Sequence, residues 1–377
     1  MTAISALSQD TRSTDRPATS PSLLPLLDRN NGFTLLRHVL AFAVIAGHSF
    51  EMAGWPEPLQ PLRVRMGVSL GRLAVDGFFV LSGYLIAASY LANPDARSFL
   101  AKRFRRIAPG CWVAAAISLL IVGPLSGATN YFARQNWPRL AADAVTLGPM
   151  LGVRGAFPNN AFHDVDGPIW SIRYEVGCYF LVLALGTVGL LGRARVVAVV
   201  AAFASLAAGL LAVRGIPADL GVGTFEGITR PIPRLVAWFL VGATCRSWTG
   251  WRSWPLGVFV GLALAMAACC YSRVALQVVG PWAGGLALIG LGSRPSQVSS
   301  WLEGRKLDLS YGMYLYAWPV QQFALAYVSP NPWVVLAIGT AGALAMGWLS
   351  WVGVERLALR RSPALYSAAP RPARLSG

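Results

Sequence analysis

The chain has few charged residues, and few of those are acidic. Only 13% of its 377 residues are charged, with 16 acidic against 32 basic side chains, whereas 55% are hydrophobic. A soluble chain of this length carries roughly twice that share of charge, about 25%. The low charge and a mean hydropathy of +0.52 exclude an ordinary soluble protein and predict a polytopic membrane protein.

Residues that bind metals or form disulfides are also scarce. There are three histidines and five cysteines. The cysteines lie in or beside apolar runs, with neither the spacing of a metal site nor a pairing pattern among loops; they are Cys111, Cys178, Cys245, Cys269 and Cys270. We therefore interpret them as packing residues and expect no metal site.

The first 27 residues lack an apolar core of signal-peptide length. They are rich in Ser, Thr and Pro, a composition typical of a disordered tail. We expect no cleavable signal peptide and assign 1–27 to a cytosolic tail.

Apolar runs of about 17 to 25 residues, the length that spans a bilayer, recur along the rest of the chain. They cover residues 34–53, 73–92, 108–127, 169–190, 196–213, 233–249, 254–271, 275–292, 308–328 and 332–352. The sequence thus predicts an all-α membrane bundle of about ten transmembrane helices over residues 28–358, followed by a basic cytosolic tail over 359–377.

The net charge of +16 would suggest a nucleic-acid partner in a soluble protein. Here ten spans place both termini and 21 of the 32 basic residues on one side. By the positive-inside rule that side is the cytosol. The partner that this charge indicates is the lipid bilayer, and we expect no nucleic acid.

Two ionisable residues lie in the first apolar run, LLRHVLAFAVIAGH. Arg37 and His48 are eleven residues apart, which puts both on one face of a helix, about 16 Å apart along its axis. An ionisable residue at membrane depth costs at least about 2.5 kcal/mol and marks a functional site more often than not. His38 lies off this face at the cytosolic edge, and His163 lies in a long external loop; solvated roles are expected for both.

Two further segments carry unexpected charge. The segment FLAKRFRRIAPGCW, residues 99–112, is expected to lie in the cytosolic loop before the third span, with Pro109 near the start of that span. Its Arg103 and Arg106 are three apart; they either fix the orientation of the protein or grip a phosphate. In GPIWSIRYEVGCYF, residues 167–180, Glu175 needs a partner or a proton. Arg37 or His48 is the expected partner, in a structural ion pair or in catalysis.

Two segments have simpler interpretations. Ser82 and Gly83, in the second span, are small residues that favour close helix packing. The segment LDLSYGMYLYAWPVQQ, residues 307–322, carries tyrosines, Trp318, Gln321 and Gln322. These side chains either line a cavity or anchor the helix at the interface.

The order of these motifs resembles the integral-membrane acyltransferase 3 family. The matching elements are Arg-x10-His, VDGFFVLSGYLI, the RxxR-bearing KRFRRIAP, IWSIRYE, LSYGMYLYAWPV and a terminal VER, together covering residues from about 28 to 358. Two positions depart from the family pattern. Ala317 stands where a histidine is frequent, and Leu357 stands where a proline commonly follows Glu-Arg. The soluble esterase-like domain that follows the membrane core in many relatives is not expected here.

The resemblance implies a membrane-bound acyltransferase, most simply an O-acetyltransferase of a bacterial inner membrane. It implies acyl-CoA, by default acetyl-CoA, as a cytosolic donor whose phosphates Arg103 and Arg106 would hold. The acceptor would be a hydroxyl of a carbohydrate or lipid-linked glycan. His48 would be the general base, supported by Arg37 and Glu175. A secondary transporter or exporter is the alternative, and a non-catalytic sensor the third possibility; the oligomeric state is open.

Overall fold

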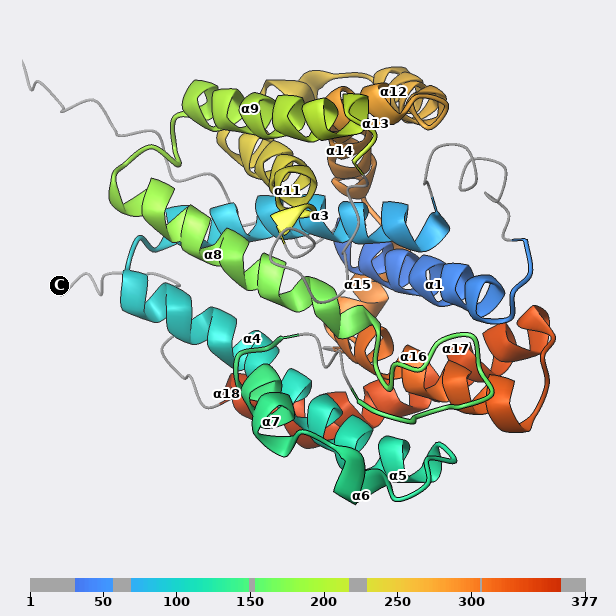
Figure 1. The fold of residues 1–377 in the computed structure, drawn as a ribbon. Helices are drawn as coiled ribbons and strands as arrows, with labels where there is room; N and C mark the ends of the chain where they lie inside the picture. The colour runs from blue at the N-terminus through green and yellow to red at the C-terminus, as the bar shows by residue number, and fades with distance from the viewer. Residues whose placement is uncertain (1–30, 57–68, 149–152, 217–228, 306, 361–377) are drawn as a thin grey trace, which may run out of the picture.

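The computed structural model describes residues 31–56, 69–148, 153–216, 229–305 and 307–360, and within these ranges the chain forms helices and no strand (Figure 1). The longer helices are α1 (Phe33–Met52), α3 (Leu70–Ala92), α4 (Ala96–Ile117), α8 (Ile172–Thr187), α9 (Ala194–Val213), α11 (Ile232–Ser247), α12 (Leu256–Cys269), α14 (Gly280–Gly292), α16 (Ser310–Tyr327) and α17 (Pro332–Ser350). The shorter ones are α5 (Gly123–Leu125), α6 (Tyr131–Arg134), α7 (Trp137–Val145), α13 (Arg273–Val278), α15 (Gln297–Gly304) and α18 (Arg356–Arg360).

Helices occupy all ten of the predicted spans. Within the described residues, six helical segments are long and apolar enough to cross a membrane: Phe33–Met52, Leu70–Ala92, Ala96–Leu125, Pro168–Thr187, Ala194–Val213 and Pro332–Leu359. The helices at the other predicted spans are shorter or more polar. For example, α11 has 16 residues, and the 18 residues of α16 include two glutamines. The all-helical membrane fold is therefore confirmed.

The segment with the basic cluster differs from its prediction. It is part of α4, which begins at Ala96 after Asp95 caps the helix by accepting a hydrogen bond from Ser98 N at 2.6 Å. Pro109 lies well inside α4, and the helix continues into a π-helical turn over Ser118–Val122. The arginines thus lie on the same rigid helix that forms the third span. The predicted span 275–292 is also divided, between α13 and α14.

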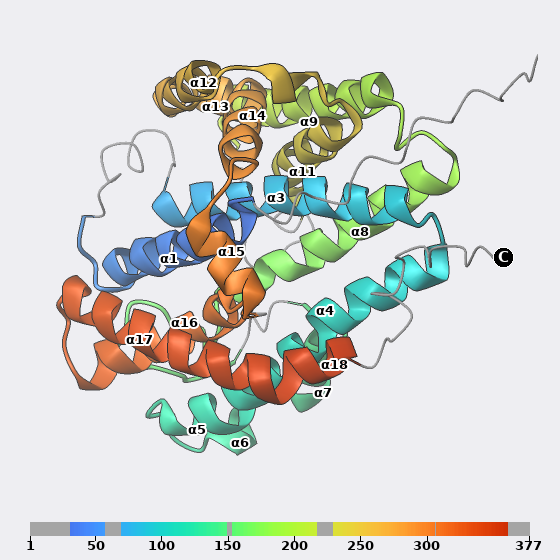
Figure 2. The ribbon, with the colours of Figure 1, turned by 180° about the vertical axis from the view of Figure 1, so that it is seen from behind.

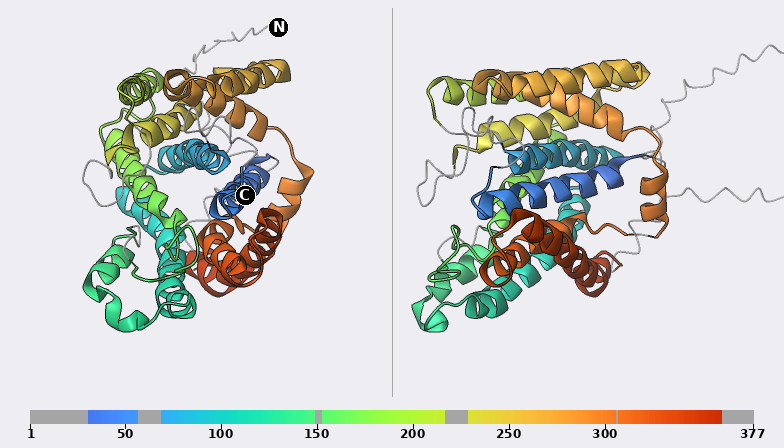
Figure 3. Two further views of the ribbon diagram at one scale, coloured as in Figure 1. Left: turned by 45° about the vertical axis from the view of Figure 1, so that its right-hand side comes forward. Right: turned by 90° about the vertical axis from the view of Figure 1, so that its right-hand side faces the viewer.

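Helix α3 lies at the centre of the bundle and packs against α1, α8, α11 and α14. The α16–α17 pair packs against α1, and α15 runs across the end of α1 on the way to α16 (Figures 2 and 3). Thr34 Oγ1 donates to Glu303 Oε1 at 2.8 Å, and Leu35 N donates to Ser299 Oγ at 3.0 Å. These bonds attach α15 to the first turn of α1.

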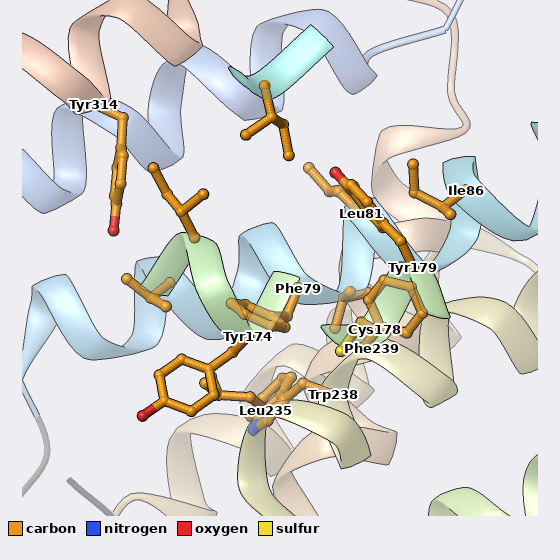
Figure 4. Packing of buried hydrophobic residues seen from close by; sticks show 14 of the residues in the cluster. Phe79, Leu81, Ile86, Tyr174, Cys178, Tyr179, Leu235, Trp238, Phe239 and Tyr314 are labelled. Atoms are coloured by element: carbon orange, nitrogen blue, oxygen red, sulfur yellow. The ribbon is translucent and has the colours of Figure 1, made fainter. Parts of the chain in front are cut away.

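Glycines allow α3 and α11 to approach closely. A side chain at Gly83 would collide with the carbonyl oxygen of Phe239, and one at Gly242 would collide with that of Val80. The packing role predicted for Gly83 is therefore confirmed. Next to this crossing, side chains of α3, α8 and α11 form the core: Phe79, Leu81, Tyr174, Cys178, Tyr179, Leu235, Trp238 and Phe239 (Figure 4).

A buried ion pair also joins α3 to α11. Asp76 Oδ1 lies 3.0 Å from Arg234 Nε, and both side chains are 2% exposed. The sequence analysis gave neither residue a partner. A buried charge without its partner is costly, so this pair ties the two helices together.

Hydrogen bonds join α1 to α16 at two levels. At the first, Leu309 N donates to His38 Nε2 at 3.3 Å. At the second, Gln321 Nε2 donates to Ile45 O at 2.7 Å and to Ser49 Oγ at 2.6 Å. The solvated role expected for His38 is wrong, because both of its ring nitrogens have partners: Nδ1 lies 2.8 Å from Thr34 O.

Two other expectations can be compared with this fold. All five cysteines are free and buried, as their packing role requires. The tails predicted over 1–27 and 359–377 lie outside the described residues, apart from 359 and 360, which belong to α18.

Candidate active site

Helix α1 carries the two residues that the sequence analysis ranked first. It is continuous from Phe33 to Met52, so Arg37 and His48 lie on one helix, three turns apart, as predicted. They face different surroundings. Arg37 lies where α4, α15 and α16 meet, and His48 lies at the opposite end of α1, near the first turn of α3.

At the Arg37 end, two arginines converge on one carboxylate. Arg106 Nη2 donates to Asp308 Oδ2 at 2.7 Å, and Arg37 Nη2 lies 3.5 Å from the same oxygen. Arg106 also donates through Nη1 to Glu355 Oε2 at 3.3 Å. We call Arg37, Arg106, Asp308 and Glu355 the arginine–carboxylate cluster. It joins α1, α4, the start of α16 and the π-helical turn Trp351–Glu355 that follows α17.

The cluster is partly shielded from solvent, and its charges balance. Side-chain exposure falls from 27% for Arg37 to 2% for Glu355. The guanidinium of Arg106 also lies 5.6 Å from the centroid of the Tyr311 ring. The cluster contains two guanidinium and two carboxylate groups, so each arginine has a carboxylate partner within the protein. Arg106 is therefore already engaged in the ligand-free protein.

Arg103 has a different environment. Arg103 Nη2 donates a long hydrogen bond to Ser89 Oγ at 3.4 Å. No carboxylate in the described part of the chain lies within ion-pair distance of it, although Glu175 and Tyr179 interact with it electrostatically at longer range. The two arginines of the RxxR motif therefore have separate partners, and Arg103 is the one that keeps its charge available.

The carboxylate of Glu175 is bound by two hydroxyl groups. Glu175 Oε1 accepts from Tyr179 Oη at 2.6 Å and from Ser82 Oγ at 2.8 Å. The expected partnership of Glu175 with Arg37 or His48 is therefore wrong, since Arg37 lies against Asp308. Ser82, which was assigned to packing alone, is a hydrogen-bond donor to this carboxylate and joins α3 to α8.

His48 is held between an aromatic ring and a carboxylate. The Trp318 ring meets the imidazole edge to face, with centroids 4.9 Å apart. Glu51 Oε2, one turn further along α1, lies 3.6 Å from His48 Nδ1. On the other side of the ring, a Cβ at Gly71 would lie 3.8 Å from His48 Cε1 and 4.0 Å from Nε2. The first turn of α3 thus lies beside the Cε1–Nε2 edge of the imidazole.

A loop preceding α8 packs against this end of α16. Trp318 Nε1 donates to Asp164 O at 2.9 Å, and Gln322 Nε2 donates to Phe162 O at 2.9 Å. Asn160 Nδ2 in the loop donates to Gln322 Oε1 at 2.7 Å. Trp318 and Gln322 are buried in these contacts and fix the loop beside the Trp318 ring, which packs against His48. His163 in the same loop is exposed, as expected.

The sequence analysis missed three residues of this site: Asp308, Glu355 and Glu51. Asp308 and Glu355 lie in segments already quoted as motifs, LDLSYG and VER, and each stands at the end of an apolar run. Glu51 is three residues after His48 and shares its helix face. These signals were present in the sequence. However, Asp308 and Glu355 both bond to Arg106, which is more than 200 residues away from each of them in the sequence.

Comparison with known proteins identifies the family. A family profile described as an acyltransferase domain, acyltransferase 3, matches residues 30–352. An O-acetyl transferase of Shigella phage Sf6 is 24% identical over 356 residues, which cover 89% of this chain and 98% of that protein. Nodulation protein 10 of Rhizobium leguminosarum bv. viciae is 26% identical over 365 residues, which cover 88% and 93%. No solved structure matches. The chain is an acyltransferase and belongs to the acyltransferase 3 family.

Proposed function

We propose that this protein is an integral-membrane O-acetyltransferase that moves an acyl group from cytosolic acyl-CoA, by default acetyl-CoA, to a hydroxyl group of a carbohydrate or lipid-linked glycan. The observation that carries the proposal is the full-length similarity to a protein named as an O-acetyl transferase. The placement of a cation and an imidazole at opposite ends of α1 agrees with a donor and an acceptor that approach from different sides.

The proposed topology has ten crossings with both termini in the cytosol of a bacterial inner membrane. In it, α11, α12, the α13–α14 pair and α16 cross together with the six long apolar segments. The short helices are covered by neighbours: α11, for example, is largely buried against α3 and α9. The basic residues of α4 then lie at the cytosolic end.

On the donor side, Arg103 is proposed as the direct contact for a phosphate of acyl-CoA. It has no carboxylate partner in the described chain, and a guanidinium binds phosphate oxygens bidentately. Arg106 is proposed to act through the arginine–carboxylate cluster, since Asp308 and Glu355 already balance its charge. The thioester would then extend toward His48, about 16 Å further along α1 than Arg37.

On the acceptor side, His48 Nε2 is proposed as the general base. It takes the proton of the acceptor hydroxyl as that oxygen attacks the thioester carbonyl carbon, a role worth typically about 10²–10⁴ in rate. The tetrahedral intermediate collapses, the carbon–sulfur bond breaks, and the imidazolium returns the proton to the leaving thiolate. The products are the ester and free CoA. Arg37 and Glu175 are proposed to support the site through Asp308 and through Ser82 and Tyr179, at a distance from the imidazole.

The test compares the envelope glycans of four otherwise identical bacterial strains by mass spectrometry and NMR. One lacks the gene, and three carry the wild type, His48→Ala or His163→Ala. An acetyl increment on glycan hydroxyls is expected with the wild type and with His163→Ala, the matched control in an exposed loop. Identical profiles in all four strains, with the protein present in the membrane on an immunoblot, would exclude glycan acylation.

A further inference from the structure

Which ring nitrogen of His48 is basic depends on the hydrogen-bond partner of the other ring nitrogen. A neutral imidazole has one N–H and one basic nitrogen, and the partner of the N–H decides which nitrogen is basic. His48 Nδ1 is shielded from solvent and has no hydrogen-bond partner in the described chain. The polar atom facing it is Glu51 Oε2, at 3.6 Å.

The ring has little freedom to turn away from Glu51. Trp318 packs edge to face against it, and that indole is itself fixed by its bond to Asp164 O. With Nδ1 on the Glu51 side, Cε1 and Nε2 face Gly71 in the first turn of α3. Gly71 has no side chain, so no Cβ contacts the Cε1–Nε2 edge of the ring from α3.

We propose that Glu51 is a positioning residue for His48. Its carboxylate accepts the Nδ1–H, which leaves Nε2 unprotonated and basic, and it stabilises the imidazolium that forms when Nε2 takes up a proton. The catalytic part of this inference rests on the proposed function. The sequence analysis expected Arg37 and Glu175 to orient the ring, but the contacts of these two residues are elsewhere. Glu51 is the carboxylate whose contact with the imidazole the structure shows.

The first experiment reads the tautomer directly and does not depend on acyl transfer. Protein labelled with ¹⁵N-histidine contains three imidazoles, and His48→Gln assigns the signal of His48. At alkaline pH, where the rings are neutral, wild type is expected to carry the proton on Nδ1. Glu51→Ala is expected to shift His48 toward the other tautomer, while His38 and His163 keep their shifts. Unchanged His48 shifts in Glu51→Ala would overturn the proposal.

The second experiment is kinetic. Glu51→Gln and Glu51→Ala are expected to lower kcat by about 10- to 100-fold with the donor KM nearly unchanged, the range usual for loss of a residue that orients a histidine. Glu51→Asp is expected to recover part of the rate because it keeps the carboxylate. The control is Asp143→Asn in α7, which removes a partly exposed carboxylate outside the site. Rates equal to wild type in Glu51→Ala would contradict the role even if the wild type is a fully active acetyltransferase.

Discussion

Arg106 and Asp308, 202 residues apart in the sequence, form the shortest ion pair of the candidate site, with Nη2 and Oδ2 2.7 Å apart. The same carboxylate oxygen faces Arg37. The arginine of the first motif and the second arginine of the RxxR motif thus share one counter-ion. The pair connects α4, whose Arg103 is proposed to meet the donor, with α16, whose Trp318 contacts His48.

Replacement of Asp308 by Asn should destabilise this end of the bundle. It leaves Arg37 and Arg106 facing each other with only Glu355 as a counter-charge, at a position that is 17% exposed. We expect a loss of about 1–3 kcal/mol, the range for a partly buried charged group that loses its partner. Thermal unfolding in detergent measures it.

A double-mutant cycle with Arg106→Gln measures the interaction energy between Asp308 and Arg106 apart from their contacts with other residues. If Asp308→Asn and Arg106→Gln act through the ion pair, the double variant should lose less stability than the sum of the two single variants. Strict additivity would show that the two residues act independently.

The two arginines of the RxxR motif should affect different quantities. Arg103→Ala is expected to raise the KM for acyl-CoA by roughly 10- to 100-fold, the equivalent of one charge-assisted hydrogen bond, with little change in the unfolding temperature. Arg106→Ala is expected to lower the unfolding temperature, because it exposes two carboxylates to each other. Lys102→Ala, one position from Arg103 on α4, is the control for a general loss of positive charge.

Steady-state kinetics with membranes and labelled acetyl-CoA give the KM values. A donor KM that rises equally in Lys102→Ala and Arg103→Ala would argue for a diffuse electrostatic effect in place of a specific contact.

Gly83→Ala should be strongly unfavourable, because its new methyl group would collide with the backbone of Phe239 on α11. The two helices would have to separate, at a cost of about 1–3 kcal/mol or more. Gly177→Ala in α8 is the matched control: a Cβ there meets nothing within 4 Å, and alanine favours the helix by about 0.5–1 kcal/mol. Unfolding temperatures of the two variants should therefore move in opposite directions, and equal shifts would contradict the close α3–α11 packing.

Asp166 should make stability depend on pH. It lies outside the long apolar segments and is 4% exposed; Ser118 Oγ donates to its Oδ2 at 3.4 Å, and Oδ1 has no partner in the described chain. Burial raises the pKa of Asp166 well above its usual value of 3.8, although the Ser118 bond opposes this shift. A carboxyl whose pKa is raised by folding stabilises the protein fully below its unfolded pKa and loses that contribution as pH rises through the folded pKa.

The unfolding temperature of wild type should therefore fall as pH rises above about 4, the range in which an unfolded aspartate ionises. Asn is neutral at every pH, so the unfolding temperature of Asp166→Asn should not show this fall. Above about pH 4 the variant should be more stable than wild type. Parallel curves for the two proteins over this range would show that Asp166 ionises in the folded state without cost.

Apolar run length predicted most of the fold, because each membrane helix is a local property of about 20 residues. Helices lie at every predicted span, and the spacing of Arg37 and His48 on one face was correct. The basic segment 99–112 was assigned to a loop because charge interrupts the apolar pattern. In the structure those arginines lie on α4, which packs against α8, α16 and α18.

The pairing of the charges was not predictable in the same way. Glu175 was assigned to Arg37 or His48 because the three were the clearest ionisable groups in the spans. The actual partners of Glu175 are the hydroxyls of Ser82 and Tyr179, and that of Arg37 is Asp308. Which helices are neighbours depends on packing between distant segments, such as the glycine contacts of α3 with α11. A single sequence does not show which distant segments pack together.

Helices α1 and α16 are attached near both ends: Arg37 contacts Asp308 at one end, and at the other end Gln321 donates to Ile45 and Ser49 while Trp318 packs against His48. Sliding one helix along the other by a single turn would break all three attachments together. The two helices therefore move as one unit, and any opening for the proposed thioester donor has to form where other helices separate from this pair.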